Sequence, residues 1–195
     1  MTFSKEILRK SIHASGVIVL VTELFWPTLT IAGLGLLAVL YTALIFFETL
    51  VGSRIPGFSK LTHFLKREER IDWAPVYLAL GIAFSLFFFE RFVARCAILQ
   101  VCLADAAACL VGKYFGKTKL PWGKKTYLGS LTYFVTALLV QLPIFYSSST
   151  RSLGLLFLMS SLGTLIEALP WRSLDNLVIP LIVGLSGQLY LKFLS

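Results

Sequence analysis

The sequence predicts an all-α fold, a polytopic membrane bundle of about seven transmembrane helices whose N-terminus lies in the cytoplasm. The first observation is composition. Of the residues, 57% are hydrophobic and 14% are charged, whereas soluble domains carry about 25% charged residues. The second is the uneven distribution of lysine and arginine between the two sides of the predicted bundle. The third is a series of uncharged runs, most of them close to the roughly 20 residues that a helix needs to cross a bilayer: 24–47, 73–89, 126–150, 152–166 and 176–191.

The predicted helices form a single integral-membrane domain that covers residues 1–195. In chain order they are expected at about 5–24, 27–50, 73–90, 94–116, 126–146, 151–169 and 175–194. Pro27 fits the first turn of the second helix, Pro170 ends the sixth, and Ser173 or Asp175 can cap the seventh. The short apolar stretch 14–22 is interpreted as part of the first span rather than as a cleaved signal peptide.

The positive charges predict the orientation of the chain. With seven spans, 14 of the 18 lysines and arginines fall on the side of the N-terminus and four fall on the other. Because cytoplasmic loops are enriched in these residues, the N-terminal side is predicted to be cytoplasmic. The net charge of +8 gathers mainly in two loops of that side, 51–72 and 113–125. Attraction to anionic membrane lipids is one interpretation of these loops, and nothing in the pattern favours a nucleic acid as partner.

Asp105 lies inside the fourth predicted helix, within an apolar run. A carboxylate in a membrane span costs about 3 kcal/mol or more, so it is a candidate functional residue by default. Cys109, Gly112 and Gly116 follow Asp105 on the same helical stripe. Packing between membrane helices uses small residues in this pattern, but it does not explain the carboxylate. The glycines leave backbone exposed, which permits the close approach of another helix or of a phosphate.

A loop rich in glycine and lysine follows this helix and leads into the next one. It contains Lys117 and Lys125, and it is followed by Gly129 and Ser130. Free amides at a helix N-terminus attract phosphate, and lysine supplies the matching positive charge. The residue order of a Walker A loop is absent. The segment therefore predicts a phosphate-binding site of another kind.

Polar residues from other helices are predicted to reach the same cytoplasmic end. Arg9, Lys10 and His13 lie near the N-terminus, where Arg9 and His13 share a helical face. The acidic and amide side chains expected there are Glu48, Glu167, Asp175 and Asn176. Taken singly, Glu48 could pair with Arg54, Asp175 could cap a helix and His13 could be structural. Taken together, carboxylates, lysines and exposed glycines are typical of a Mg²⁺–nucleotide site.

In this order, the motifs resemble the membrane kinase family that contains dolichol kinase, phytol kinase and the CTP-dependent diacylglycerol kinase of yeast. The resemblance covers nearly the whole chain. Its elements are Arg9-Lys10-x-x-His13-x-x-Gly16, Asp105-Ala-x-Ala-x-x-x-Gly112-Lys-x-x-Gly116-Lys, Lys125-Thr-x-x-Gly129-Ser130, Glu167 and Asp175-Asn176-x-x-x-Pro180. Two positions depart from the family pattern: Thr126 replaces an expected serine, and Ala106 lies in a segment that often has a glycine nearby.

The resemblance implies transfer of the γ-phosphate of a nucleoside triphosphate, CTP in the characterised members, to a lipid alcohol at the cytoplasmic face. The alcohol would be a polyprenol, dolichol, phytol or a similar isoprenoid. The expected catalytic residues are Asp105, Glu167 and Lys125, with Asp105 or Glu167 as proton acceptor. The expected Mg²⁺ ligands are Asp105, Glu167 and Asp175. The expected nucleotide- and phosphate-binding residues are Arg9, Lys10, His13, Gly112, Lys113, Gly116, Lys117, Gly129 and Ser130, with Glu48 and Asn176 nearby.

Two other functions stay open at this point. The phosphatidate cytidylyltransferases are distantly similar to this family, and such an enzyme would make a CDP-lipid and release pyrophosphate. The short chain favours the kinase. A membrane transporter would use Asp105 as an ion or proton relay. It predicts charges spread through several spans and internal symmetry, and the sequence has neither.

Overall fold

The computed structural model describes the 195-residue chain apart from residues 1–2, 52–54, 56, 60–71, 148–151 and 195. The predicted all-α class is confirmed. Throughout the described ranges the regular elements are helices, with one isolated bridge between Lys119 and Thr126. In chain order these helices are α1 Phe3–Ala14, η1 Ser15–Ile18, α2 Val19–Phe25, α3 Pro27–Val51, α5 Ala74–Phe88, α6 Arg91–Leu99, η2 Gln100–Ala104, α7 Asp105–Phe115, α8 Tyr127–Ser147, α9 Leu153–Ala168, η3 Arg172–Leu174 and α10 Asp175–Leu194.

Four helical stretches are long and apolar enough to cross a membrane. They are Pro27–Val51, Arg91–Phe115, Tyr127–Tyr146 and Asp175–Phe193. The helices α5 and α9 are apolar too, but they have only 15 and 16 residues, and a straight crossing takes roughly 20. The chain is therefore a multi-pass membrane protein with four candidate spans among its described helices. The count of about seven spans stays a prediction.

Two predicted helices are interrupted. The helix expected at 5–24 is divided into α1 and α2 by η1, a 3₁₀ turn that contains Gly16. There the backbone packs closely on the central span, because a Cβ on Gly16 would lie 3.0 Å from Cys102 Sγ. The helix expected at 94–116 is divided into α6 and α7 by η2, a π-helical segment in which the backbone N–H of Asp105 donates to the carbonyl of Gln100.

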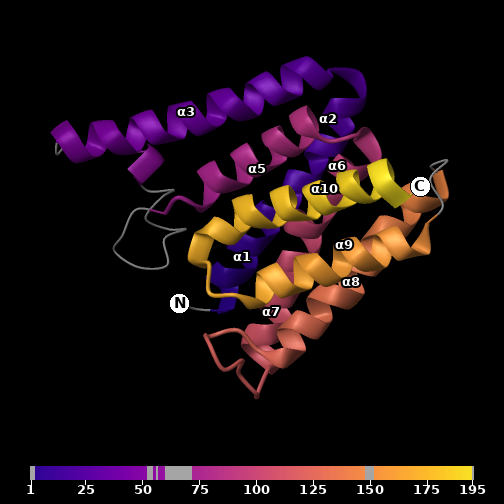
Figure 1. Ribbon diagram of the computed structural model, residues 1–195. Helices are drawn as coiled ribbons and strands as arrows, with labels where there is room; N and C mark the ends of the chain where they lie inside the picture. The colour runs from indigo at the N-terminus through magenta and orange to yellow at the C-terminus, as the bar shows by residue number, and fades with distance from the viewer. Residues whose placement is uncertain (1–2, 52–54, 56, 60–71, 148–151, 195) are drawn as a thin grey trace.

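The helices pack side by side around one central span (Figure 1). Along the bundle α3 contacts α5, α5 contacts α10, α10 contacts α9, α9 contacts α8 and α8 contacts α7. In the span Arg91–Phe115, which α6, η2 and α7 form together, 72% of the most apolar window is buried inside the protein, against 11% in Pro27–Val51. The Asp105 span is thus the centre of the fold, and α3 lies at its periphery.

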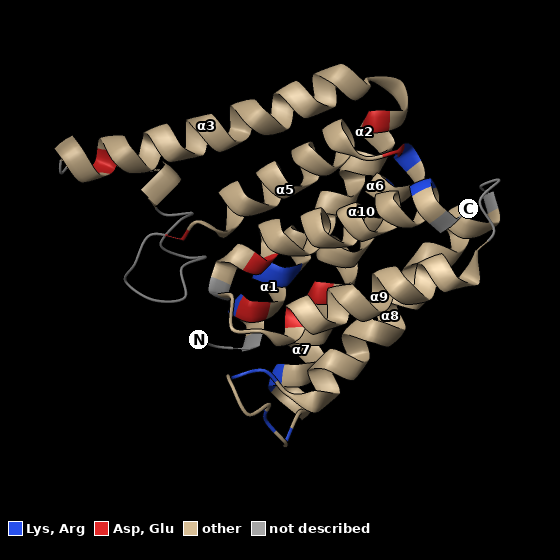
Figure 2. Cartoon of the chain, viewed as in Figure 1, with Lys and Arg blue, Asp and Glu red and all other residues tan. Residues whose placement is uncertain are grey.

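Charged residues gather at the two ends of the bundle, as Figure 2 shows. One end holds the start of α1, the end of α7, the lysine-rich loop and the junction between α9 and α10. At the other end, the buried carboxylate of Glu23 accepts hydrogen bonds from Arg95 Nη2 at 2.8 Å and Nε at 3.2 Å. Arg91 Nε lies 3.7 Å from the same carboxylate. This second group ties α2 to α6.

Candidate functional site

Asp105 is the first residue of α7 and is 4% exposed. Its Oδ2 atom accepts a hydrogen bond from Lys10 Nζ, which reaches it from α1. His13 lies one turn after Lys10, with Nε2 at 2.7 Å from the carbonyl oxygen of Val101 and at 3.4 Å from Asp105 Oδ2. Two of the predicted basic residues of the N-terminus, Lys10 and His13, therefore contact the predicted acid, although 95 positions separate Lys10 from Asp105.

A second ion-pair group surrounds Lys125, in the loop before α8. Lys125 Nζ lies 3.1 Å from Glu167 Oε1 and 3.2 Å from Asp175 Oδ2, and it also donates to the backbone carbonyl of Glu167. Ser130, in the first turn of α8, donates to Glu167 Oε2 at 3.3 Å. Glu167 lies in the last turn of α9 and Asp175 begins α10, and both are more than nine-tenths buried. One lysine thus connects three helices.

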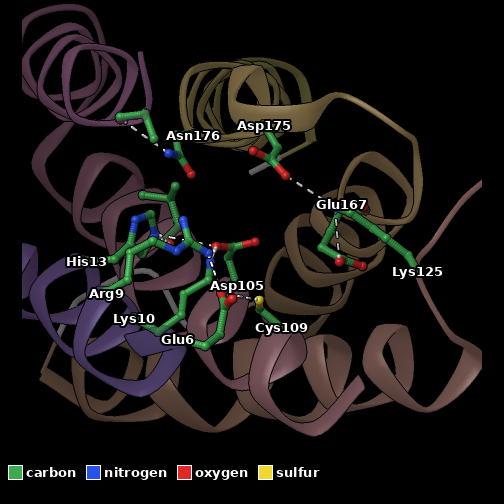
Figure 3. A network of polar contacts seen from close by, with 12 residues as sticks. Glu6, Arg9, Lys10, His13, Asp105, Cys109, Lys125, Glu167, Asp175 and Asn176 are labelled. Carbon is green, nitrogen blue, oxygen red and sulfur yellow. Dashed lines mark hydrogen bonds and ion pairs between the residues drawn. The ribbon is translucent and has the colours of Figure 1, made fainter. Parts of the chain in front are cut away.

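The two groups face one another, as Figure 3 shows. The carboxylates of Asp105, Asp175 and Glu167 surround a common central space, with Lys10 on one side and Lys125 on the other. Burial alone would lower the pKa of Lys125, but the charges of Glu167, Asp175 and Asp105 outweigh burial and raise it above the ordinary lysine value. Lys125 therefore stays positively charged in the presence of these carboxylates.

Glu6 is the acidic member of the site that the sequence analysis missed. Its side chain is 1% exposed. It accepts a hydrogen bond from Arg9 at 2.5 Å and one from Lys113 at 2.7 Å, and the thiol of Cys109 lies 3.6 Å away. In the sequence Glu6 resembles an ordinary surface residue of an amphipathic first helix. The available signal was its spacing, which places Glu6, Arg9, Lys10 and His13 on adjoining turns.

The predicted glycines lie where α7 and α8 meet. A Cβ on Gly112 would lie 2.9 Å from Thr126 Oγ1 and 3.0 Å from the Cα of Gly129. The Thr126 hydroxyl donates to the Gly112 carbonyl at 3.3 Å and accepts from the Gly129 amide at 3.1 Å. Gly116 packs on the same threonine. These glycines thus allow the close approach of a second helix, and their contact with a phosphate stays a prediction.

The remaining predicted residues occupy different places. Asn176 lies beside the central space in Figure 3, and its Nδ2 donates to the Ala74 carbonyl at 3.3 Å. Lys117 is exposed and borders a shallow surface hollow. Glu48, at the end of α3, accepts hydrogen bonds from the amide of Ile55 and the hydroxyl of Ser59. These contacts hold Glu48 to the segment that follows its own helix. Arg54, its possible partner, lies outside the described residues.

The predicted magnesium ligands can be tested against this geometry. Among the residues that the structure describes, no three His, Cys, Asp or Glu side chains lie close enough to enclose a metal ion by themselves. Mg²⁺ at a nucleotide site takes oxygen ligands, usually one or two carboxylates together with phosphate oxygens and waters. Asp105 and Asp175 supply such oxygens at the edge of the central space. The chemistry of the donors therefore fits a nucleotide-borne Mg²⁺, with the phosphates completing the ligand set.

Comparison with known proteins places the chain among distant relatives. It is 29% identical to phytol kinase 1, chloroplastic, of Arabidopsis thaliana over 143 residues, which are 65% of this chain and 46% of the plant protein. It is 26% identical to farnesol kinase, chloroplastic, of the same plant over 209 residues, covering 96% of this chain and 66% of the relative. An uncharacterized protein of Rickettsia prowazekii is 29% identical over 200 residues, with 96% of both chains covered.

These relatives define a group. Among the distant curated homologues of the chain are phytol kinases and a farnesol kinase. The resemblance found in the sequence motifs is therefore confirmed. The chain spans about half the length of the plant phytol kinases that it matches. No protein-family model matches the chain, and no solved structure matches it.

Proposed function

We propose that this chain, a distant relative of phytol and farnesol kinases, is a membrane kinase that transfers the γ-phosphoryl group of CTP to the hydroxyl of an isoprenoid alcohol. One observation carries the proposal. Three carboxylates and two lysines from separate parts of the chain surround one buried polar space at the end of an apolar bundle. Buried charge of this density is costly, and phosphoryl transfer requires this combination of acids and cations.

In this proposal the triphosphate is bound by cations that border the central space. Lys10 and Lys125 would exchange part of their contact with carboxylates for contact with phosphate oxygens. Arg9 is a further candidate, because its buried Nε atom has no hydrogen-bond partner among the described residues. Lys113 and Lys117 lie further out and would attract the nucleotide from the aqueous side. Positioning and charge neutralisation are the main sources of rate in such reactions.

Asp105 and Asp175 are the residues that would hold Mg²⁺, which supplies neutralisation of the phosphate charge when bound. Glu167 then remains as the proton acceptor. It lies beside Ser130, at the end of α9 and close to the junction with the apolar interior. A lipid hydroxyl that arrives from the bilayer would meet this carboxylate before it met the basic residues of α1.

The reaction balances without a further reactant. The alcohol oxygen forms a bond to the γ-phosphorus, and the bond from that phosphorus to the β,γ-bridging oxygen breaks. The bonding electron pair leaves with the nucleoside diphosphate. The hydroxyl proton passes to the carboxylate of Glu167 and from there to water. The products are the lipid phosphate, the nucleoside diphosphate and one proton.

Labelled nucleotide tests the proposal directly. The purified protein is incubated in detergent with CTP labelled at the γ- or the α-phosphate, with Mg²⁺ and with phytol, farnesol or dolichol. Parallel samples contain ATP, GTP or UTP. We expect γ-label, and no α-label, in the organic phase. Transfer of α-label would identify a cytidylyltransferase instead. Absence of transfer from every nucleotide to every alcohol would contradict kinase function.

A further inference from the structure

A second polar group lies deeper in the bundle and was not among the predicted site residues. Tyr133 of α8 donates a hydrogen bond from its hydroxyl to Gln100 Oε1 at 3.2 Å. Both side chains are completely buried. They pack against α9 at Gly163, where an added Cβ would lie 2.8 Å from the Tyr133 hydroxyl oxygen. The glycine thus leaves room for the Gln100–Tyr133 pair between three helices.

The pair lies directly beneath the ion-pair groups. Tyr133 is three residues after Ser130 on α8, and Gly163 is four residues before Glu167 on α9. On both helices the pair is therefore one turn inward from the contact between Ser130 and Glu167. On the central span, Gln100 precedes Asp105 through the π-helical segment η2.

Gln100 keeps an unused donor. Its Nε2 atom has no hydrogen-bond partner within the described part of the chain. Leaving a buried donor unsatisfied lowers the stability of a fold, so such groups in native proteins call for a ligand, a water or a functional reason. The Tyr133 hydroxyl holds the carbonyl end of the amide, and this contact determines which end of Gln100 remains available. The location in a π-helical segment agrees with a functional role, because such segments occur frequently at functional sites.

We propose that Gln100 Nε2 donates a hydrogen bond to the hydroxyl oxygen of the lipid alcohol, and that Tyr133 is the positioning residue that orients the Gln100 amide for this contact. The inference rests on the proposed kinase function. A neutral amide suits a neutral hydroxyl, whereas the phosphates are matched by the cations one turn further out. The neighbouring core is apolar, with Val101, Ala104 and Ala137 fully buried, as the first carbons of an isoprenoid chain require.

The donated hydrogen bond leaves the alcohol oxygen free to act as nucleophile. The oxygen keeps a lone pair for the γ-phosphorus while its own proton can point toward Glu167, one turn above. A site that hydrogen-bonds a substrate hydroxyl also discriminates against molecules that lack it. The Gln100–Tyr133 pair would therefore select the hydroxyl end of an isoprenoid from the hydrocarbon tails of the surrounding membrane.

The test compares Gln100→Leu and Tyr133→Phe with a matched control, Gln141→Leu. Gln141 is an equally buried glutamine on α8, eight residues beyond Tyr133, where it donates to the Ala137 carbonyl and the Ser160 hydroxyl. The KM for farnesol and the KM for CTP are measured separately for each purified protein by γ-label transfer. We expect Gln100→Leu to raise the KM for farnesol roughly tenfold, as loss of one buried hydrogen bond would, and to leave the KM for CTP unchanged.

Tyr133→Phe should produce a smaller rise in the same constant, since the amide remains and only its orientation is lost. Gln141→Leu should change neither KM. An unchanged KM for farnesol in Gln100→Leu, with altered thermal stability alone, would show that the amide binds water or is structural, and would overturn the inference. If Gln100→Leu does not fold, Tyr133→Phe, which removes a single oxygen, decides in its place. Wild-type protein that transfers no label at all refutes the kinase function itself, so the two failures are distinguishable.

Discussion

At the scale of residues, the site consists of ion pairs that water hardly reaches. The side chains of Lys10 and Asp105 are each 6% exposed. A buried ion pair is weak evidence for stability, because an apolar pair of similar volume often stabilises a fold as well. Removing one partner is different, since it leaves a buried charge uncompensated at a cost of about 3–5 kcal/mol. The Lys10–Asp105 pair is therefore better explained by function than by stability.

Asp105→Asn should strongly reduce phosphoryl transfer and also lower the thermal stability of the protein. The amide removes the charge that we propose binds Mg²⁺, and it leaves Lys10 without its counter-charge. We expect γ-label transfer to fall at least a hundredfold, by comparison with the loss of single preorganised charged groups in other enzymes, about 10²–10³. Label transfer and the unfolding temperature in detergent are the two measurements.

The double variant Lys10→Met/Asp105→Asn separates the two effects. It removes both members of the pair, so stability should recover toward the wild-type value while activity stays lost. If activity returned together with stability in the double variant, Asp105 would act through folding alone.

The raised pKa of Lys125 leads to a prediction on pH. Its ordinary value is 10.5 and the surrounding carboxylates raise it, so the side chain stays protonated across the neutral and moderately alkaline range. The contacts of Lys125 therefore stabilise the fold fully below the ordinary lysine pKa and are lost only as the pH rises through the raised value. We expect the KM for CTP to stay flat between about pH 7 and 9. A steep rise within that interval would indicate a Lys125 that loses its proton early.

At the scale of elements, the contact between α7 and α8 positions the lysine-rich loop between them. Gly112 and Gly129 meet backbone to backbone, and the Thr126 hydroxyl bridges them. Because Lys125 precedes Thr126 directly, the position of its ammonium group depends on this approach. The small-residue stripe beside Asp105 thus acts through packing, and through packing it locates a charge of the site.

Gly112→Ala should lower the unfolding temperature and raise the KM for CTP. The added methyl group would lie too close to Thr126 and Gly129. Overpacking of this kind lowers the free energy of unfolding by roughly 1–3 kcal/mol. Gly33→Ala on α3 is the control, because nothing lies within 4 Å of a Cβ there. That variant should leave both the unfolding temperature and the KM for CTP unchanged. Equal destabilisation of both proteins would contradict a specific contact at Gly112.

Helix positions were predictable because apolar length and proline placement determine them. The helix expected at 27–50 is α3 Pro27–Val51, and the one expected at 175–194 is α10 Asp175–Leu194. The interruptions η1 and η2 were not predictable, since both respond to neighbouring helices rather than to local composition. The first is opposed by Cys102, and the second lies in the most buried span. Tertiary packing determined both.

At the scale of the whole molecule, the buried ion pairs of the described residues form two separate centres. One is the candidate site, and the other is the Glu23–Arg95 contact at the opposite end. The sequence analysis identified the acids and lysines of the first centre from their common side. It could not assign partners, because the pairing of Lys10 with Asp105 arises only when α1 packs on α7. Glu6 and Gln100 were missed because an exposed-looking acid and a neutral amide give no composition signal.

The charge distribution predicts that the end with the lysine-rich loop faces the cytoplasm. Lys119 lies in the lysine-rich loop and Lys192 near the end of α10, and both are exposed. In cells, Lys192→Cys should react with a membrane-impermeant maleimide from outside, and Lys119→Cys should react only after the membrane is permeabilised. The native cysteines, Cys96, Cys102 and Cys109, are first replaced by alanine. Labelling of Lys119→Cys in intact cells would contradict the predicted cytoplasmic location of the lysine-rich loop.

The π-helical segment η2 has a consequence for the angular phase of the central span. Successive residues of an α-helix are rotated by about 100°, so five residues of ordinary α-helix would turn Asp105 well away from Gln100. The wider turn, closed by the bond from the Asp105 amide to the Gln100 carbonyl, accompanies a different arrangement, in which Gln100 contacts Tyr133 of α8 and Asp105 contacts Lys10 of α1. It also sets the rotation of everything downstream, Cys109 and Gly112 included. The extra residue in this one turn therefore sets the direction of Asp105, which contacts Lys10 of α1. The apolar residues before the turn remain buried in the core.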